Sequence, residues 1–130
     1  MNKLVYEALL DVDGGVVVTG MRDGGTFKVA LDAAPEVAYL PWLRLAGVDC
    51  PEKATDAGKA ARAHVFNLLR NAGAASVRSE GRRSFDRLVA DVWLDGQHLA
   101  TELVQDGFAV YWTRSRYAHF GVEPPRWVAA

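Results

Sequence analysis

The first half of the chain has the spacing of apolar residues that is typical of β-strands. Polar and apolar residues alternate from Thr26 to Leu31, which predicts a strand with one face in the core. Apolar and β-branched runs predict further strands at 4–10, 16–19 and 37–48. Glycine-rich turns at 13–15 and 22–25 separate the first three runs, and Pro41 interrupts the last.

The spacing then changes to that of a helix. Apolar residues recur at i, i+4, i+7, i+8 and i+11 from Ala61 to Ala72, so they lie on one helical face. Thr55 or Asp56 can cap the start of this helix, and Gly73 is placed to end it. A helix is therefore predicted directly after the first group of strands.

Two more strands and a second helix are predicted in the second half. The strands lie at 76–80 and 88–94, on either side of a turn at 81–86. The second helix, at about 99–106, is shorter. Residues 113–130 are expected to form an irregular, aromatic-rich tail, because two consecutive prolines and little helical spacing oppose a helix there.

The order of these elements predicts a mostly β, α+β fold. It matches a five-stranded OB-fold barrel with a helix after its third strand and a second short helix near the C-terminus. The length of 130 residues suits a single domain covering 1–130.

Composition and charge exclude some functions. The formal net charge of −1 argues against a protein that coats nucleic acid through bulk charge, although a few arginines can still meet one phosphate. The single cysteine, Cys50, cannot form an internal disulfide. We find no run that suits a secretion signal or a membrane span, so a cytoplasmic setting without membrane contact is expected.

The segment RLAGVDCPE, residues 44–52, carries charges at both ends of what otherwise reads as a buried strand. In a straight strand, Arg44 and Asp49 would point to opposite faces and lie about 16 Å apart. A bulge or twist near Gly47 would bring them to one site. We therefore expect the chain to bend there.

Four segments together resemble the staphylococcal nuclease (thermonuclease) family, over about residues 16–112. The middle segment, 44–52, is the most specific, because Arg, Asp, Pro and Glu seldom coincide at these spacings. The other three segments that carry the resemblance are Asp23-Gly24-Gly25-Thr26, Phe85-Asp86-Arg87 and 95–109.

The resemblance implies an OB barrel and calcium-dependent hydrolysis of DNA and RNA phosphodiester bonds. By position, Arg44 and Arg87 would hold the phosphate and Glu52 would act on the attacking water. Asp49 would bind Ca²⁺ with its carboxylate and Cys50 with its backbone carbonyl. This chemistry needs such residues, because paired guanidinium donors suit phosphate oxygens and a carboxylate can take the proton of the water.

One position departs from the family pattern. Gly25 stands where the family has a second calcium-binding aspartate, while the first aspartate of the turn is retained as Asp23. Hard cations need several oxygen ligands, so Ca²⁺ affinity should fall and any nuclease activity should be weak. Asp23 is a candidate substitute ligand and otherwise a turn residue.

Aromatic residues and an arginine-rich hairpin are candidates for contact with nucleotides. Phe85, Tyr111 and Trp112 could stack on bases, although aromatic residues beside a barrel often belong to its core. The hairpin could bind phosphate or be an exposed tip, and its arginines are Arg78, Arg82, Arg83 and Arg87.

Two functions remain open at this point. The leading interpretation is a thermonuclease-like enzyme that depends on metal. The alternative is a catalytically inactive module of the same fold that binds nucleic acid or a protein partner, in which Arg44 and Glu52 form only a structural ion pair. Catalysis by the Cys50 thiol is not favoured, because no histidine lies near it in the sequence.

Overall fold

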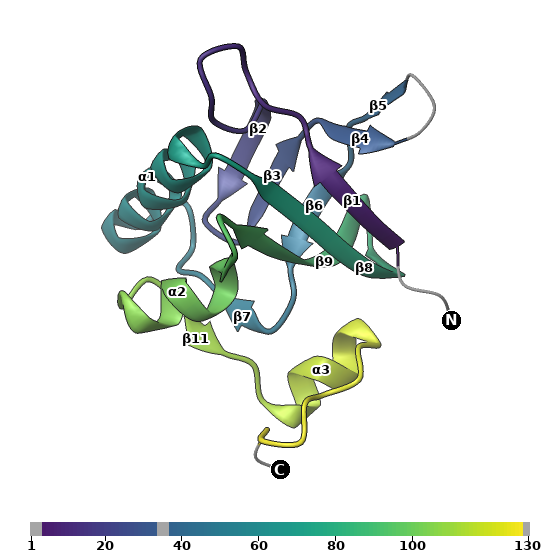
Figure 1. Cartoon of the computed structure of the whole chain (residues 1–130). Helices are drawn as coiled ribbons and strands as arrows, with labels where there is room; N and C mark the ends of the chain where they lie inside the picture. The colour runs from purple at the N-terminus through teal and green to yellow at the C-terminus, as the bar shows by residue number, and fades with distance from the viewer. Residues whose placement is uncertain (1–3, 34–36, 129–130) are drawn as a thin grey trace.

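The structure is a computed structural model that describes residues 4–33 and 37–128 of the chain. Its helices are α1 (Asp56–Asn71), α2 (Leu99–Gln105) and α3 (Arg114–Phe120) (Figure 1). Its strands are β1 (Leu4–Ala8), β2 (Val18–Asp23), β3 (Thr26–Val29), β4 (Leu31–Ala33), β5 (Val37–Tyr39), β6 (Trp42–Leu45), β7 (Val48–Asp49), β8 (Ala75–Ser84), β9 (Arg87–Leu94), β10 (Gln97–His98) and β11 (Val110–Tyr111). None of the helices in these segments is long and apolar enough to cross a membrane.

Most of the strands form one mixed sheet. Its order is β2-β3-β6-β9-β8-β1-β4-β5, with β10 paired to β9, and β7 pairs separately with β11. The pair β6–β9 is parallel and the other pairs of this order are antiparallel. Among the described residues the two ends of this order are not paired, so the five-stranded barrel is not confirmed. The chain is mostly β with three described helices.

The sheet is strongly curved where β3 continues into β4. The two strands are separated only by Ala30, yet β3 pairs with β6 and β4 pairs with β1. The main core lies against the inner face of this curve and includes side chains from α1 and α2. Its largest fully buried side chains are Phe27, Leu31, Leu43, Leu45, Leu69, Leu88, Leu99 and Leu103.

Helix α1 forms where the apolar spacing predicts it. Thr55 caps it by accepting a hydrogen bond from the backbone N–H of Gly58 at 3.0 Å, as one of the two expected caps. Gly58 also packs directly on the preceding loop, because a Cβ there would lie 1.7 Å from the carbonyl oxygen of Glu52. The start of α1 therefore fixes the backbone that carries Glu52.

The C-terminal tail is not irregular throughout, contrary to the sequence prediction for residues 113–130. Helix α3 lies within it, capped by Thr113 at its start and by Gly121, with φ of 66°, at its end. Tyr117 and Phe120 lie three residues apart on one face and are both buried. A helix of seven residues is too short to produce a clear period, which is why the sequence did not reveal it.

A second apolar cluster holds α3 on the outer face of the sheet. Trp112 stacks on Phe120 with 4.5 Å between ring centroids and meets the edge of Tyr117 at 5.1 Å. On the sheet side, these rings meet Ala46 and Val89. The residues that follow α3 also join this cluster, through Val128.

We expect Phe120→Ala to lower the free energy of unfolding by about 3 kcal/mol, because it removes a buried ring from this cluster. Urea denaturation followed by tryptophan fluorescence measures the loss. Phe66→Ala is the matched control, since Phe66 is 40% exposed on α1 and should lose far less. Equal losses in the two variants would contradict the packing of α3 on the sheet.

Candidate functional site

The chain bends between β6 and β7, as the spacing of Arg44 and Asp49 requires. Gly47 has φ of 87°, in the left-handed region that favours glycine. Two hydrogen bonds hold the chain just before this bend to the segments on either side of it. The N–H of Leu45 donates to Gly25 O and that of Ala46 to Ala90 O, each at 2.8 Å. As a result, Nη2 of Arg44 donates to Oδ1 of Asp49 at 2.5 Å, and the expected bend is confirmed.

Arg44 is a buried cation, with 6% of its surface exposed. Its Nη1 donates to Leu45 O at 3.2 Å, and its guanidinium lies 5.6 Å from the ring centroid of Trp112 and 5.5 Å from that of Phe120. Burial lowers the pKa of Arg44 from its ordinary value, and the neighbouring carboxylate of Asp49 opposes this shift. The side chain stays charged because carboxylate and aromatic faces surround it.

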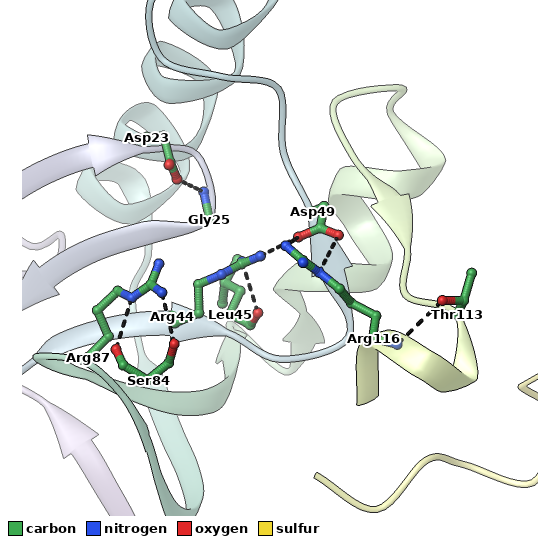
Figure 2. A network of polar contacts seen from close by, with 9 residues as sticks. All are labelled: Asp23, Gly25, Arg44, Leu45, Asp49, Ser84, Arg87, Thr113 and Arg116. Carbon is green, nitrogen blue, oxygen red and sulfur yellow. Dashed lines mark hydrogen bonds and ion pairs between the residues drawn. The ribbon is translucent and has the colours of Figure 1, made fainter. Parts of the chain in front are cut away.

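Asp49 has a second arginine partner, Arg116 of α3 (Figure 2). Nε of Arg116 donates to Oδ2 of Asp49 and Nη2 to Oδ1, each at 3.1 Å. Both carboxylate oxygens of Asp49 therefore accept hydrogen bonds from guanidinium groups. Sequence reasoning missed Arg116, because the expected irregular tail offered no reason to bring residue 116 near residue 49.

Arg87 lies on the same face of the sheet as Arg44. In the parallel pair β6–β9, Arg44 is opposite Val89 and Arg87 is opposite Trp42, so the two arginines are one pleat apart on neighbouring strands. The Arg87 guanidinium donates to Ser84 O at 3.2 Å and to Ser84 Oγ at 2.9 Å. Its charge is close enough to contribute to the lowered pKa of Arg44 (Figure 2).

Glu52 follows the bend and is exposed. Its carboxylate makes no hydrogen bond or ion pair with any residue of the described segments, while its backbone carbonyl accepts from Thr55. The structural ion pair considered for Arg44 and Glu52 is therefore not formed here, because Asp49 takes that place.

The turn at 23–26 behaves as a turn and not as a ligand set. Oδ1 of Asp23 accepts a hydrogen bond from the N–H of Gly25 at 2.8 Å, as a turn-forming aspartate does. A Cβ at Gly25 would lie only 2.7 Å from Nη1 of Arg44. The absence of a side chain at Gly25 therefore leaves the space that the Arg44 guanidinium occupies.

Cys50 is a poor nucleophile in this environment. Burial raises the pKa of its thiol to about 11, and the nearby charge of Asp23 adds to the increase. The thiol is therefore protonated at neutral pH, which agrees with the expectation that it takes no part in catalysis.

The residues present do not fit a calcium ion. Both oxygens of Asp49 are occupied by arginines, Gly25 supplies no ligand, and Oδ1 of Asp23 is used by the turn. Two guanidinium groups add positive charge beside Asp49, which opposes a divalent cation. Within the described residues, no three His, Cys, Asp or Glu side chains gather in a group that could hold a metal.

The three aromatic candidates have different environments. Trp112 is 3% exposed and stacked on Phe120, so its ring leaves no face for a base. Phe85 is 93% exposed at the tip of the β8–β9 hairpin, with φ of 60°. Tyr111 is 42% exposed and meets the ring of Trp127 at 5.3 Å between centroids. Phe85 and Tyr111 thus remain available for contact with a ligand.

The arginine-rich hairpin is tied to the rest of the sheet at its turn. Arg22 of β2 donates to both carboxylate oxygens of Asp86, at 3.0 and 2.6 Å. This pair compensates the negative charge that Asp86 would otherwise present beside Arg87. The side chain of Arg82 lies outside the described residues.

A cleft of about 370 Å³, lined in part by Tyr117, opens between β9, the start of α2 and the tail. His98 lies at its wall and joins Asp91 and Thr101, with 2.8 Å to each from its two ring nitrogens. Tyr111 lines this cleft as well. No local sequence pattern marks this contact, because Asp91 lies on β9 and His98 on β10.

One family model matches the part of the chain that carries this site. The family model described as "Staphylococcal nuclease homologue" matches residues 42–121, which is more than half of the chain and runs from β6 through α3. A search of curated proteins found no match. The matched region includes Arg44, Asp49, Glu52 and Arg87, the residues on which the sequence resemblance depends. The chain belongs to the staphylococcal nuclease homologue family.

Proposed function

We propose that this chain is a nucleic-acid-binding member of its family that does not hydrolyse phosphodiesters with calcium. The observation that carries this proposal is the state of Asp49, whose two oxygens are both held by arginine side chains. The family supports contact with nucleic acid, and the missing carboxylate at Gly25 opposes a metal-dependent reaction.

Arg87 is the residue that we expect to meet phosphate. A guanidinium carries five N–H donors, and Arg87 uses only two of its nitrogens, both on Ser84. Its remaining donors suit the paired oxygens of a phosphate group. Arg44, in contrast, is covered by Trp112 and Phe120, so a phosphate would meet Arg87 first.

Phe85 is the residue that we expect to stack on a base. A phenylalanine with positive φ is a backbone outlier, and this ring is almost fully exposed. The two-residue turn between Ser84 and Arg87 accounts for the positive φ, but core packing does not account for an aromatic side chain at this exposed position. An exposed aromatic ring two residues before an arginine suits a single-stranded nucleic acid, whose bases have free faces.

A second candidate is the metal-dependent nuclease that leads the sequence interpretation. It is favoured by the carboxylate of Glu52, which is free of described partners three residues after Asp49. In this reading Arg44 and Arg87 hold the phosphate, Glu52 activates water, and Asp49, Asp23 and the Cys50 carbonyl hold Ca²⁺. It requires Asp49 to exchange an arginine for the ion.

A cleavage assay distinguishes the two candidates. Plasmid DNA, single-stranded DNA and RNA are incubated with the protein and calcium, manganese or a chelator. We expect no cutting under any of these conditions, because the site lacks a ligand set for the ion. Metal-dependent cutting that disappears in Glu52→Ala would contradict the proposal and establish the nuclease.

Binding is measured separately, by the fluorescence anisotropy of labelled single-stranded oligonucleotides at several salt concentrations. Arg87→Ala should weaken binding and reduce the slope of log K against log salt by about 0.7 to 1, since one phosphate contact is lost. Phe85→Ala should weaken binding by about 1–3 kcal/mol and leave that slope unchanged, since stacking releases no counterion.

The matched controls for these variants are Arg114→Ala and Phe66→Ala. Arg114 is exposed on α3 and donates to Val128 O, while Phe66 is exposed on α1. Both should bind as the unchanged protein does. An unchanged protein that binds neither DNA nor RNA would refute the proposal in favour of a protein partner.

A further inference from the structure

We infer that Arg116 takes the place of a metal ion at Asp49, so that an arginine of α3 supplies the positive charge that an ion would otherwise bring. This inference deepens the proposed function and rests on the same contacts of Asp49, but it concerns which cation Asp49 binds and not whether the chain binds nucleic acid. It rests on the contacts of Asp49, the charges around it, and the packing at Gly25.

Both oxygens of the Asp49 carboxylate accept hydrogen bonds from arginine. Oδ1 accepts from Arg44 at 2.5 Å and from Arg116 at 3.1 Å, and Oδ2 accepts from Arg116 at 3.1 Å. Arg116 approaches both oxygens at once, which is the two-pronged geometry that guanidinium favours with carboxylate. An ion at these oxygens would therefore compete with Arg116 for them.

The charges around Asp49 are balanced without an ion. Asp23 and Asp49 both act on Arg44, and the two guanidiniums of Arg44 and Arg116 match these two carboxylates. Arg87 adds a further positive charge nearby. A divalent cation would therefore bring positive charge to carboxylates that arginines already compensate.

The guanidinium groups of Arg116 and Arg44 both lie near the ring of Phe120. Arg116 lies 5.1 Å from the ring centroid of Phe120, and Arg44 lies 5.5 Å from it. The face of an aromatic ring attracts cations, so Phe120 holds two like charges that would otherwise repel each other. Residue 116 is placed here by helix α3, which Thr113 caps.

The Gly25 backbone lies beside the Arg44 guanidinium. Nη1 of Arg44 occupies the space beside the Gly25 backbone, where a Cβ would lie 2.7 Å away. A side chain at position 25 would therefore require the end of the Arg44 side chain to shift. The missing carboxylate and the added arginine act in the same direction, and each removes a reason to bind metal.

The test uses calcium alone and needs no nucleic acid, so its failure is distinguishable from a failure of nucleic-acid binding. Thermal unfolding is followed in a chelator and over a calcium titration, because an ion that binds only the folded state raises the melting temperature. The variants are Arg116→Ala and its matched control on the same helix, Arg114→Ala. Both are made in the unchanged chain and in Gly25→Asp, which returns a carboxylate to the site.

We expect the unchanged chain and Arg114→Ala to unfold at temperatures that calcium does not alter. Removal of Arg116 should create a calcium response, and in the Gly25→Asp background it should lower the calcium dissociation constant by about tenfold or more against the Arg114→Ala control. The inference is overturned if, in both backgrounds, calcium raises the melting temperature of Arg116→Ala no more than that of Arg114→Ala. It is also overturned if calcium raises the melting temperature of the unchanged chain as much as that of Arg116→Ala.

Discussion

The candidate site depends on the ion pairs that the Asp49 carboxylate forms with Arg44 and Arg116. This carboxylate compensates the charge of Arg44, which could not be buried under Trp112 and Phe120 without a partner. It also binds Arg116 and thereby attaches α3 to the short strand β7. One acidic side chain thus contacts a buried cation and the last helix and lies just after a sharp bend, and arginines contact both of its oxygens.

The features that the sequence predicted are those determined by neighbouring residues. Helix α1 follows from its own apolar spacing and from Thr55 as a cap three residues before Gly58. The bend at Gly47 follows from a glycine between two charges that a straight strand would separate. The β8–β9 hairpin was predicted from two apolar strands, but β8 continues to Ser84, so the turn is shorter than the predicted 81–86. In each case the physical cause lies within about ten residues.

The features that the sequence did not predict depend on distant segments. The parallel pairing of β6 with β9 joins strands with a helix and a long strand between them, and no local pattern specifies it. Arg116 and Asp49 are 67 residues apart, and their contact exists only because α3 packs on the sheet through Tyr117 and Phe120. The family resemblance identified Arg44, Asp49 and Arg87, but it had no position that corresponds to an arginine partner from the tail.

The contact between Gly47 and Tyr117 has a consequence for how this protein can evolve. A Cβ at Gly47 would lie 3.0 Å from the hydroxyl oxygen of Tyr117, on a backbone that already favours glycine. A larger residue at the bend would therefore have to adopt a strained backbone and also shift the Tyr117 hydroxyl group. Relatives that keep this helix docked should therefore favour glycine at position 47 wherever tyrosine occupies position 117.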